Sequence, residues 1–133
     1  GLAELRFGEI RREKHQGLTL FLTLGTGIGS ALFYNGQLIP NLELGHIPYK
    51  KGILEDYVSN AARQNKKLTW EEYGRKLNEA LTLLNHLFSP EIIILGGGIS
   101  KKYKKFGGYL NEEINIRPAS LQNNAGIIGA CLL

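Results

Sequence analysis

The first half of the chain alternates apolar runs with glycine-rich turns. Leu18 to Leu24 is apolar with two threonines, which predicts a strand. Gly25 to Gly29 is a glycine-rich turn, and Ser30 to Tyr34 predicts a second strand. Asn35-Gly36 is the dipeptide most typical of a tight hairpin, so the chain is expected to turn back there. The return strand, Gln37 to Ile39, ends before a proline.

The middle of the chain has the period of a helix. After Gly52, apolar residues at positions 53, 54, 57, 58, 61 and 62 share one helical face. Thr69 is a typical N-cap, and Glu72 completes a capping box with it. The helix that follows carries apolar residues at positions 70, 73, 77, 80, 81, 84, 87 and 88 and is expected to end before Pro90.

The last third returns to strand patterns. Glu91 to Leu95, EIIIL, is typical of a parallel strand that is buried on both faces. Gly96-Gly97-Gly98 follows, and a helix is expected through the lysines beyond it. Ile114 to Leu121 predicts a strand interrupted by Pro118, and Asn124 to Leu133 predicts an apolar helix. This order of elements predicts an α/β domain with a mixed sheet and flanking helices.

Composition is that of an ordinary globular domain. The chain has 133 residues, of which 43% are hydrophobic and 21% are charged, enough for one domain with a substantial core. No apolar run is long enough to span a membrane, and the first residues lack the apolar core of a signal peptide. The single cysteine, Cys131, cannot form an internal disulfide. These features favour a cytoplasmic protein with no membrane partner.

Two glycine clusters each follow a predicted strand. LGTGIGS contains Gly25, Gly27 and Gly29 with the hydroxyl of Thr26, and LGGGIS supplies the second cluster. Ligands of α/β proteins bind at the carboxyl ends of strands, where successive backbone amides attract anions such as phosphate. The first cluster leads into a strand and no GK[ST] is present, so neither the dinucleotide fingerprint nor a Walker loop applies. Each cluster alone is also consistent with a tight turn.

Two polar groupings add candidate chemistry. Glu43 and His46 lie three residues apart in Glu-Leu-Gly-His, a pairing that suits either a ligand rich in hydroxyls or a metal ion. The net charge is +4, and Lys101, Lys102 and Lys105 belong to a dense basic run. Such clustering favours contact with a polyanion. For both groupings, an ordinary solvated surface stays open as the alternative.

The motifs together resemble those of a known family. LGTGIGSALFYNGQLIPNLELGH resembles the signature of the ROK sugar kinases, which belong to the actin-like, hexokinase-like superfamily. GILEDYVS resembles the family's Gly-Cys-Leu-Glu segment, and LFSPEIIILGGGISKK resembles its adenosine-side glycine motif. A tryptophan-led helix and the closing ASLQNNAGIIGA are similar to the polyphosphate glucokinase branch. The resemblance implies that residues 1–133 form an α/β, hexokinase-like (ribonuclease H-like) C-terminal lobe.

The resemblance also implies an activity and a site. The activity is phosphoryl transfer from polyphosphate or ATP to the 6-hydroxyl of glucose, with Mg²⁺ bridging the phosphates. The residues implied to bind glucose hydroxyls are Glu43, His46 and Glu55. Those implied to bind the transferred phosphoryl group, the nucleotide or the polyphosphate are Thr26, Gly27, Gly29, Gly96, Gly97, Gly98, Lys101, Lys102 and Lys105.

The chain departs from the family pattern in two ways. Many members have zinc-binding cysteines before the Gly-Cys-Leu-Glu segment, but here the interval is IPYKK and Ile53 takes the cysteine position, so no zinc is expected. The family's first phosphate loop and catalytic aspartate belong to an N-terminal lobe. The aspartate base is therefore expected just upstream of Gly1, none of these 133 residues is expected to be catalytic, and the isolated chain is expected to be inactive. The full-length protein is implied to be a homodimer.

Two other interpretations stay open. The family includes sugar-responsive transcriptional repressors, so the chain could be the sugar-sensing domain of one. The lysine run and the missing zinc cysteines argue against this, and nucleic acid is not an expected partner. A standalone α/β binding domain is the third interpretation.

Overall fold

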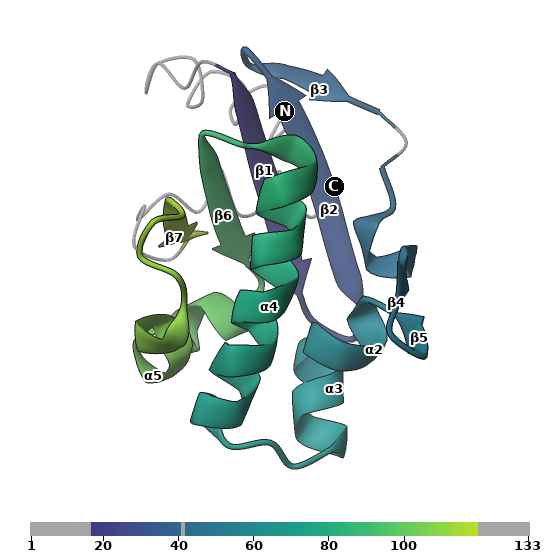
Figure 1. Ribbon diagram of the computed structural model, residues 1–133, viewed down its shortest axis with the longest axis vertical. Coiled ribbons are helices and arrows are strands. Elements are labelled where there is room, and N and C mark those ends of the chain that lie inside the picture. The colour runs from purple at the N-terminus through teal and green to yellow at the C-terminus, as the bar shows by residue number, and fades with distance from the viewer. Residues whose placement is uncertain (1–16, 41, 120–133) are drawn as a thin grey trace.

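The computed structural model describes residues 17–40 and 42–119, which form a five-stranded sheet with helices against it (Figure 1). The spatial order of the strands is β3-β2-β1-β6-β7. β1 pairs antiparallel with β2 and parallel with β6, so the predicted mixed sheet is confirmed. The strands are β1 (Leu18–Leu24), β2 (Ile28–Tyr34), β3 (Gln37–Ile39), β6 (Ile92–Gly96) and β7 (Ile116–Pro118).

Helices and a small hairpin fill the connections between these strands. One helix, α4 (Trp70–Phe88), lies across the sheet, and the remaining helices are short (Figure 1). They are η1 (Leu44–His46), α2 (Glu55–Val58), α3 (Asn60–Asn65), η2 (Gly98–Lys102), α5 (Tyr103–Phe106) and η3 (Gly107–Tyr109), with a hairpin of β4 (Pro48–Tyr49) and β5 (Gly52–Ile53). None of the helices in the described ranges is long and apolar enough to cross a bilayer.

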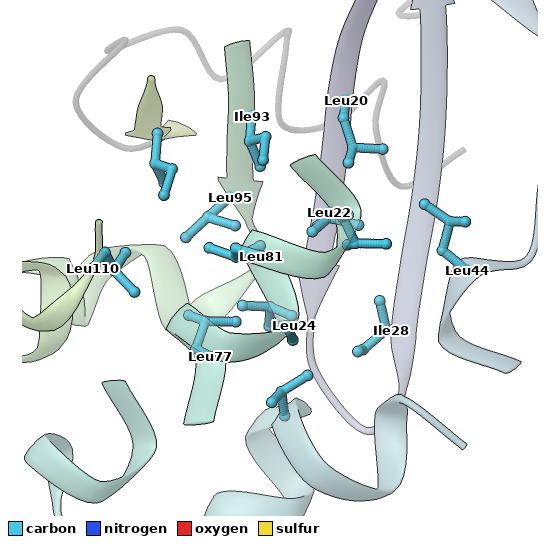
Figure 2. Packing of buried hydrophobic residues seen from close by; sticks show 14 of the residues in the cluster. Leu20, Leu22, Leu24, Ile28, Leu44, Leu77, Leu81, Ile93, Leu95 and Leu110 are labelled. Carbon is cyan, nitrogen blue, oxygen red and sulfur yellow. The ribbon is translucent and has the colours of Figure 1, made fainter. Parts of the chain in front are cut away.

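The main core lies between the sheet and α4. Successive strand residues point to opposite faces, so Leu20, Leu22 and Leu24 join the cluster under α4, whereas Phe21 joins a smaller cluster. Leu81 packs against the same strands from α4 and is fully buried (Figure 2). Burial on both faces explains why β1 and β6 are almost continuously apolar.

The predicted boundaries of α4 are confirmed. The backbone N–H of Glu72 donates to the Thr69 hydroxyl at 3.1 Å, and the N–H of Thr69 donates to the Glu72 carboxylate at 2.8 Å. These two bonds are the capping box, and they satisfy two amides that the first helical turn leaves without partners. The helix ends at Phe88, before Ser89, which has a left-handed φ of 45°.

The single helix predicted after Gly52 is wrong. Gly52 and Ile53 form β5 instead, and the helical segment is divided at Ser59, whose backbone is extended (φ −71°, ψ 161°). The Ser59 hydroxyl accepts from the N–H of Ala62 at 3.0 Å and caps α3. A serine in this position favours capping over continuing a helix, and this local preference prevails over the apolar period.

The elements beyond β6 are shorter than predicted. The helix expected through the lysines is divided into η2, α5 and η3, the last of which starts at two glycines, poor helix formers. The strand expected from Ile114 to Leu121 is only Ile116–Pro118 within the described residues. Pro118 lies within this strand without disrupting the sheet because β7 is at its edge. The helix predicted at Asn124 to Leu133 lies outside the described residues.

Leu81→Ala tests the packing of α4 on the sheet. The side chain is fully buried, so its truncation should lower the free energy of unfolding by about 2–5 kcal/mol. Leu87→Ala is the matched control, because Leu87 lies on the same helix but is 59% exposed; it should change stability by less than about 0.5 kcal/mol. Urea unfolding measures both, and equal losses would contradict this packing.

Candidate functional site

The first glycine cluster forms a compact turn at the carboxyl end of β1. The N–H of Gly25 donates to the carbonyl of Gly27 at 3.0 Å, and the N–H of Ala61 donates to the carbonyl of Gly25 at 3.0 Å. The second bond ties the turn to α3. A cavity of about 360 Å³ opens above the turn. Its lining residues are Thr23, Gly25, Thr26, Gly27, Ile28, Gly29, Glu55 and Gly97.

Glu55 lies at the centre of this arrangement. Its Oε1 accepts a hydrogen bond from the backbone N–H of Ile28 at 3.2 Å and lies 3.7 Å from Nε2 of His46. The Glu55 side chain is only 25% exposed, whereas that of His46 is 63% exposed. The carboxylate of Glu55, the first residue of α2, therefore connects the glycine turn with the Glu-Leu-Gly-His segment.

Two glycines make room for this carboxylate. A Cβ on Gly27 would lie 2.9 Å from Glu55 Oε1, and a Cβ on Gly45 would lie 2.7 Å from the same atom. Any side chain at either position would push Glu55 away. Gly27 of the first glycine cluster and Gly45 of Glu-Leu-Gly-His are thus explained by a shared close approach to one residue.

Ser30 fixes the segment that carries Glu43. Its hydroxyl donates to the carbonyl of Leu42 at 3.0 Å and accepts from the N–H of Leu44 at 3.2 Å. The carbonyl of Glu43 accepts from the N–H of His46 at 3.1 Å, which closes the turn of η1. Glu43 itself is exposed. Sequence analysis missed Ser30, although a hydroxyl residue directly after the glycine turn was a usable signal.

A buried tyrosine positions the helix that carries Glu55. The Tyr73 hydroxyl, on α4, donates to the carbonyl of Val58 at the end of α2, at 2.7 Å. Burial raises the pKa of Tyr73 well above its ordinary value, so the hydroxyl stays a donor throughout the physiological range. The long helix therefore holds α2 in place from behind the cavity.

The second glycine cluster reaches the same cavity through one residue. Gly96 is paired with Thr23 in the parallel register of β6 and β1, and Gly97 lines the cavity. Gly97 has a φ of 82°, a conformation that glycine adopts most readily. Gly98 begins η2 and is not among the lining residues. The two glycine motifs, about 70 residues apart, thus meet at the ends of neighbouring strands.

The lysines lie apart from the cavity. Lys101, Lys102 and Lys105 are exposed on η2 and α5 and do not line it. Lys105 Nζ lies 5.9 Å from the centre of the Trp70 ring, at the start of α4. The structure therefore brings His46 and Glu55 to the first glycine turn. Glu43 is exposed and, like the lysines, is not among the residues that line the cavity.

A smaller side pocket adjoins the cavity and was not predicted. It measures about 180 Å³ and shares Thr26 and Glu55 with the cavity. Lys66 enters its lining from the end of α3 and donates from Nζ to the carbonyl of Asp56 at 3.1 Å. The remaining lining residues are Asp56, Ser59, Ala61, Ala62 and Asn65.

Metal ligands are sparse in this part of the chain. Within residues 17–40 and 42–119, no group of three or more His, Cys, Asp and Glu side chains is placed to hold an ion. Mg²⁺ commonly binds through one or two carboxylates together with the phosphates of a substrate. In that mode of binding the phosphates provide most of the ligands, so few protein carboxylates are needed.

The chain resembles known proteins both in sequence and in structure. The chain is 37% identical over 132 residues to a polyphosphate glucokinase of Mycobacterium tuberculosis H37Rv, covering 99% of this chain and 49% of that protein. The structure matches an inorganic polyphosphate/ATP-glucomannokinase from Arthrobacter sp. strain KM with a TM-score of 0.78 and 44% identity, over 88% of this chain and 46% of the other. No protein-family model matches.

Two more distant structures show the fold alone. One is a ROK family glucokinase from Streptomyces griseus in complex with glucose and AMPPNP, with a TM-score of 0.68 and 22% identity over 98% of this chain and 64% of the other. The second is a ROK family transcriptional regulator, with a TM-score of 0.62 and 16% identity over 97% and 50%. Both share the hexokinase-like α/β architecture described above.

These similarities define a class and then a branch within it. The chain belongs to the ROK family of sugar kinases. Within that family it is similar to the polyphosphate glucokinases, at 37% identity, as the sequence motifs indicated. The chain spans about half the length of the curated relatives it matches.

Gly45→Ala tests the close approach of Glu55. The new methyl group would lie 2.7 Å from both Glu55 Oε1 and the carbonyl of Ile28, so the free energy of unfolding should fall by about 1–3 kcal/mol. Gly108→Ala is the control, since a Cβ there meets nothing within 4 Å; it should be neutral or slightly stabilising. Chemical denaturation compares them, and a harmless Gly45→Ala would refute the tight packing around Glu55.

Proposed function

We propose that this chain forms the sugar-binding and phosphate-binding part of a kinase that transfers a phosphoryl group from polyphosphate or ATP to the 6-hydroxyl of glucose. The observation that carries the proposal is the position of Glu55, between the amide of Ile28 in the glycine turn and the imidazole of His46. The names of the relatives, a polyphosphate glucokinase and a polyphosphate/ATP-glucomannokinase, support this choice of substrates.

The proposed sugar site consists of Glu43, His46 and Glu55. Glucose is uncharged and rich in hydroxyls, so it is bound best by several fixed acceptors within a small space. The two carboxylates accept hydrogen bonds, and the imidazole donates or accepts one. Hydrogen bonds to charged groups contribute more than neutral ones, which suits carboxylates in this role.

The proposed phosphate site is the glycine turn opposite. Thr26, Gly27 and Gly29 line the cavity with little side-chain bulk, so their backbones can approach a phosphoryl group closely. Gly97 and its neighbours Gly96 and Gly98 are proposed to line the donor side. Phosphoryl transfer depends mainly on positioning and on stabilising charge, and Mg²⁺ carried by the phosphates supplies part of that charge.

The general base is proposed to lie outside these 133 residues. The residues of this site are proposed to bind and orient the sugar and the phosphate. None of them is proposed to accept the proton of the glucose 6-hydroxyl. We propose that an aspartate in an N-terminal lobe of the full-length protein accepts it, and that this chain alone is inactive. The complete reading frame is therefore the form in which kinetics should be measured.

The alternative is a sugar-sensing domain of a ROK-family repressor. Its support is a likeness of fold at 16% identity, which carries no information on activity. A helix-turn-helix in the complete reading frame, together with sugar binding and no kinase activity, would favour it over the kinase.

Glu55→Gln tests the sugar site in the complete reading frame. The amide keeps the size of the side chain but loses the charge, so kcat/KM for glucose should fall about tenfold or more, while KM for the donor changes little. Glu79→Gln is the control, because Glu79 is an exposed carboxylate that pairs with Lys50. Steady-state kinetics with varied glucose measures both, and a fully active Glu55→Gln would remove Glu55 from the sugar site.

Lys101→Ala/Lys102→Ala/Lys105→Ala tests the donor side. Polyphosphate has roughly one charge per phosphate, whereas ATP has other binding groups, so kcat/KM should fall about tenfold with long polyphosphate and far less with ATP. Raising the salt should reproduce the loss in the unaltered protein. Lys51→Ala/Lys67→Ala removes two exposed lysines elsewhere and is the control. Equal losses with both donors would show that these lysines are only a solvated surface.

A further inference from the structure

The β4–β5 hairpin connects two of the proposed sugar-binding residues. It begins one residue after His46 and ends one residue before Glu55. The backbone N–H of Leu54 donates to the carbonyl of Ile47 at 3.1 Å, so the chain neighbours of the two sugar-binding residues are bonded to each other. A movement of the hairpin relative to α2 would therefore change the spacing between the imidazole of His46 and the carboxylate of Glu55.

The helix that carries Glu55 is too short to hold its own orientation. α2 has four residues, about one helical turn, and a single turn is not stable by itself. Successive residues of a helix point about 100° apart, so Glu55 can face the glycine turn while Asp56 and Tyr57 face other parts of the chain. The orientation of Glu55 must therefore depend on the bonds that the rest of α2 makes with its surroundings.

Asp56 and Tyr57 both bind the backbone of the hairpin, which lies beside α2 in Figure 1. The Asp56 carboxylate accepts from the N–H of Ile53 at 3.1 Å, and the Tyr57 hydroxyl accepts from the N–H of Lys51 at 3.1 Å. Gly52 permits this close approach, because a Cβ there would lie 2.6 Å from Asp56 Oδ2. The hairpin backbone is thus fitted to two consecutive side chains of α2.

The ring of Tyr57 adds packing to these hydrogen bonds. It meets the ring of Tyr49, on β4, edge to face, with the ring centres 5.4 Å apart. On the other side, Lys66 Nζ lies 4.6 Å from the centre of the Tyr57 ring and also donates to the carbonyl of Asp56. Contacts from the hairpin and from the residue after α3 therefore converge on the same part of α2.

Asp56 and Tyr57 do not line the cavity that contains Glu55. Tyr57 lines neither the cavity nor the side pocket, and Asp56 lines only the side pocket. Asp56 Oδ2 is, in addition, already the acceptor for the N–H of Ile53. An effect of these two side chains on a ligand in the cavity would therefore pass through Glu55.

We propose that Asp56 and Tyr57 are positioning residues, which hold the β4–β5 hairpin against α2 and so fix the carboxylate of Glu55 relative to His46. The inference rests on the proposed function for the identity of the ligand, glucose. A displaced carboxylate keeps its charge, but its hydrogen bonds to sugar hydroxyls lose their favourable length and angle. Loss of the positioning bonds should therefore weaken the use of glucose and leave the use of the phosphoryl donor unchanged.

Amide hydrogen exchange reads the position of Glu55 without any ligand. The N–H of Ile28 donates to Glu55 Oε1, so its exchange rate reports whether the carboxylate is in place. In the complete protein, Tyr57→Phe and Asp56→Ala should each speed exchange at Ile28 about three- to tenfold, as expected for the loss of one hydrogen bond. NMR measures this, with the buried Ile93 as the internal reference. Unchanged exchange at Ile28, or an equal increase at Ile93, would overturn the proposal.

Asp56→Asn separates the hydrogen bond of Asp56 from its charge. The amide oxygen can still accept from Ile53, so kcat/KM for glucose should stay within about twofold of the unaltered protein. Asp56→Ala should lower it about three- to tenfold without changing KM for the donor. Gly52→Ala should resemble Asp56→Ala, because its methyl group displaces the carboxylate without removing a polar group. Equal losses in Asp56→Asn and Asp56→Ala would contradict the positioning role.

Two exposed residues provide matched controls. Tyr34→Phe removes the hydroxyl of a tyrosine on β2 that is 53% exposed. Glu79→Gln removes the charge that pairs with Lys50 of the hairpin from α4, and exposed ion pairs of this kind contribute little. Neither variant should change exchange at Ile28 or kcat/KM for glucose. A loss in Glu79→Gln as large as that in Tyr57→Phe would show that α4, and not α2, holds the hairpin.

The two proposals can fail separately. Faster exchange at Ile28 in the variants of a complete protein that does not phosphorylate glucose would refute the proposed function and leave the positioning role intact. Phosphorylation of glucose with unchanged kcat/KM in both Asp56→Ala and Tyr57→Phe would do the reverse.

Discussion

The parallel pairing of β1 with β6 is the constraint on which the site depends. It places Thr23 opposite Gly96, so the turns that follow the two strands open at the same edge of the sheet. The antiparallel pairing of β1 with β2 then returns the chain past the first turn, with Thr23 opposite Gly29. Three strands, each of which adds apolar side chains to the core under α4, therefore fix the backbone around a single cavity.

The charged group that lines the cavity, the carboxylate of Glu55, comes from α2, which follows the sheet strands β1 to β3 in the chain. Glu55 is held by the amide of Ile28. Gly27 and Gly45 leave room for its carboxylate, because neither has a side chain that would clash with it. Ser30 and Tyr73 support the arrangement from two sides, one by anchoring η1 and the other by anchoring α2. A carboxylate held in this way is preorganised, so little ordering is left for a ligand to induce.

Sequence patterns were sufficient where one local preference dominated. The capping box at Thr69, the apolar strands and the Asn35-Gly36 hairpin all formed as predicted, because each depends on a few adjacent residues. The division of the predicted helix at Ser59 was missed, because the apolar period favours one continuous helix whereas the capping hydroxyl of Ser59 favours a new helix start. The side pocket and the contacts of Trp70 were also missed, because they depend on tertiary packing between α3, α4 and α5.

We propose that one cavity holds a sugar at Glu55 and a phosphate at the glycine turn. The most direct measurement is a crystal structure of the complete protein with glucose and a non-hydrolysable donor. We expect glucose hydroxyls within hydrogen-bonding distance of the Glu55 and His46 side chains, with the 6-hydroxyl directed towards the terminal phosphate at Thr26 and Gly27. Glucose bound elsewhere, with Glu55 contacting only protein and water, would contradict it.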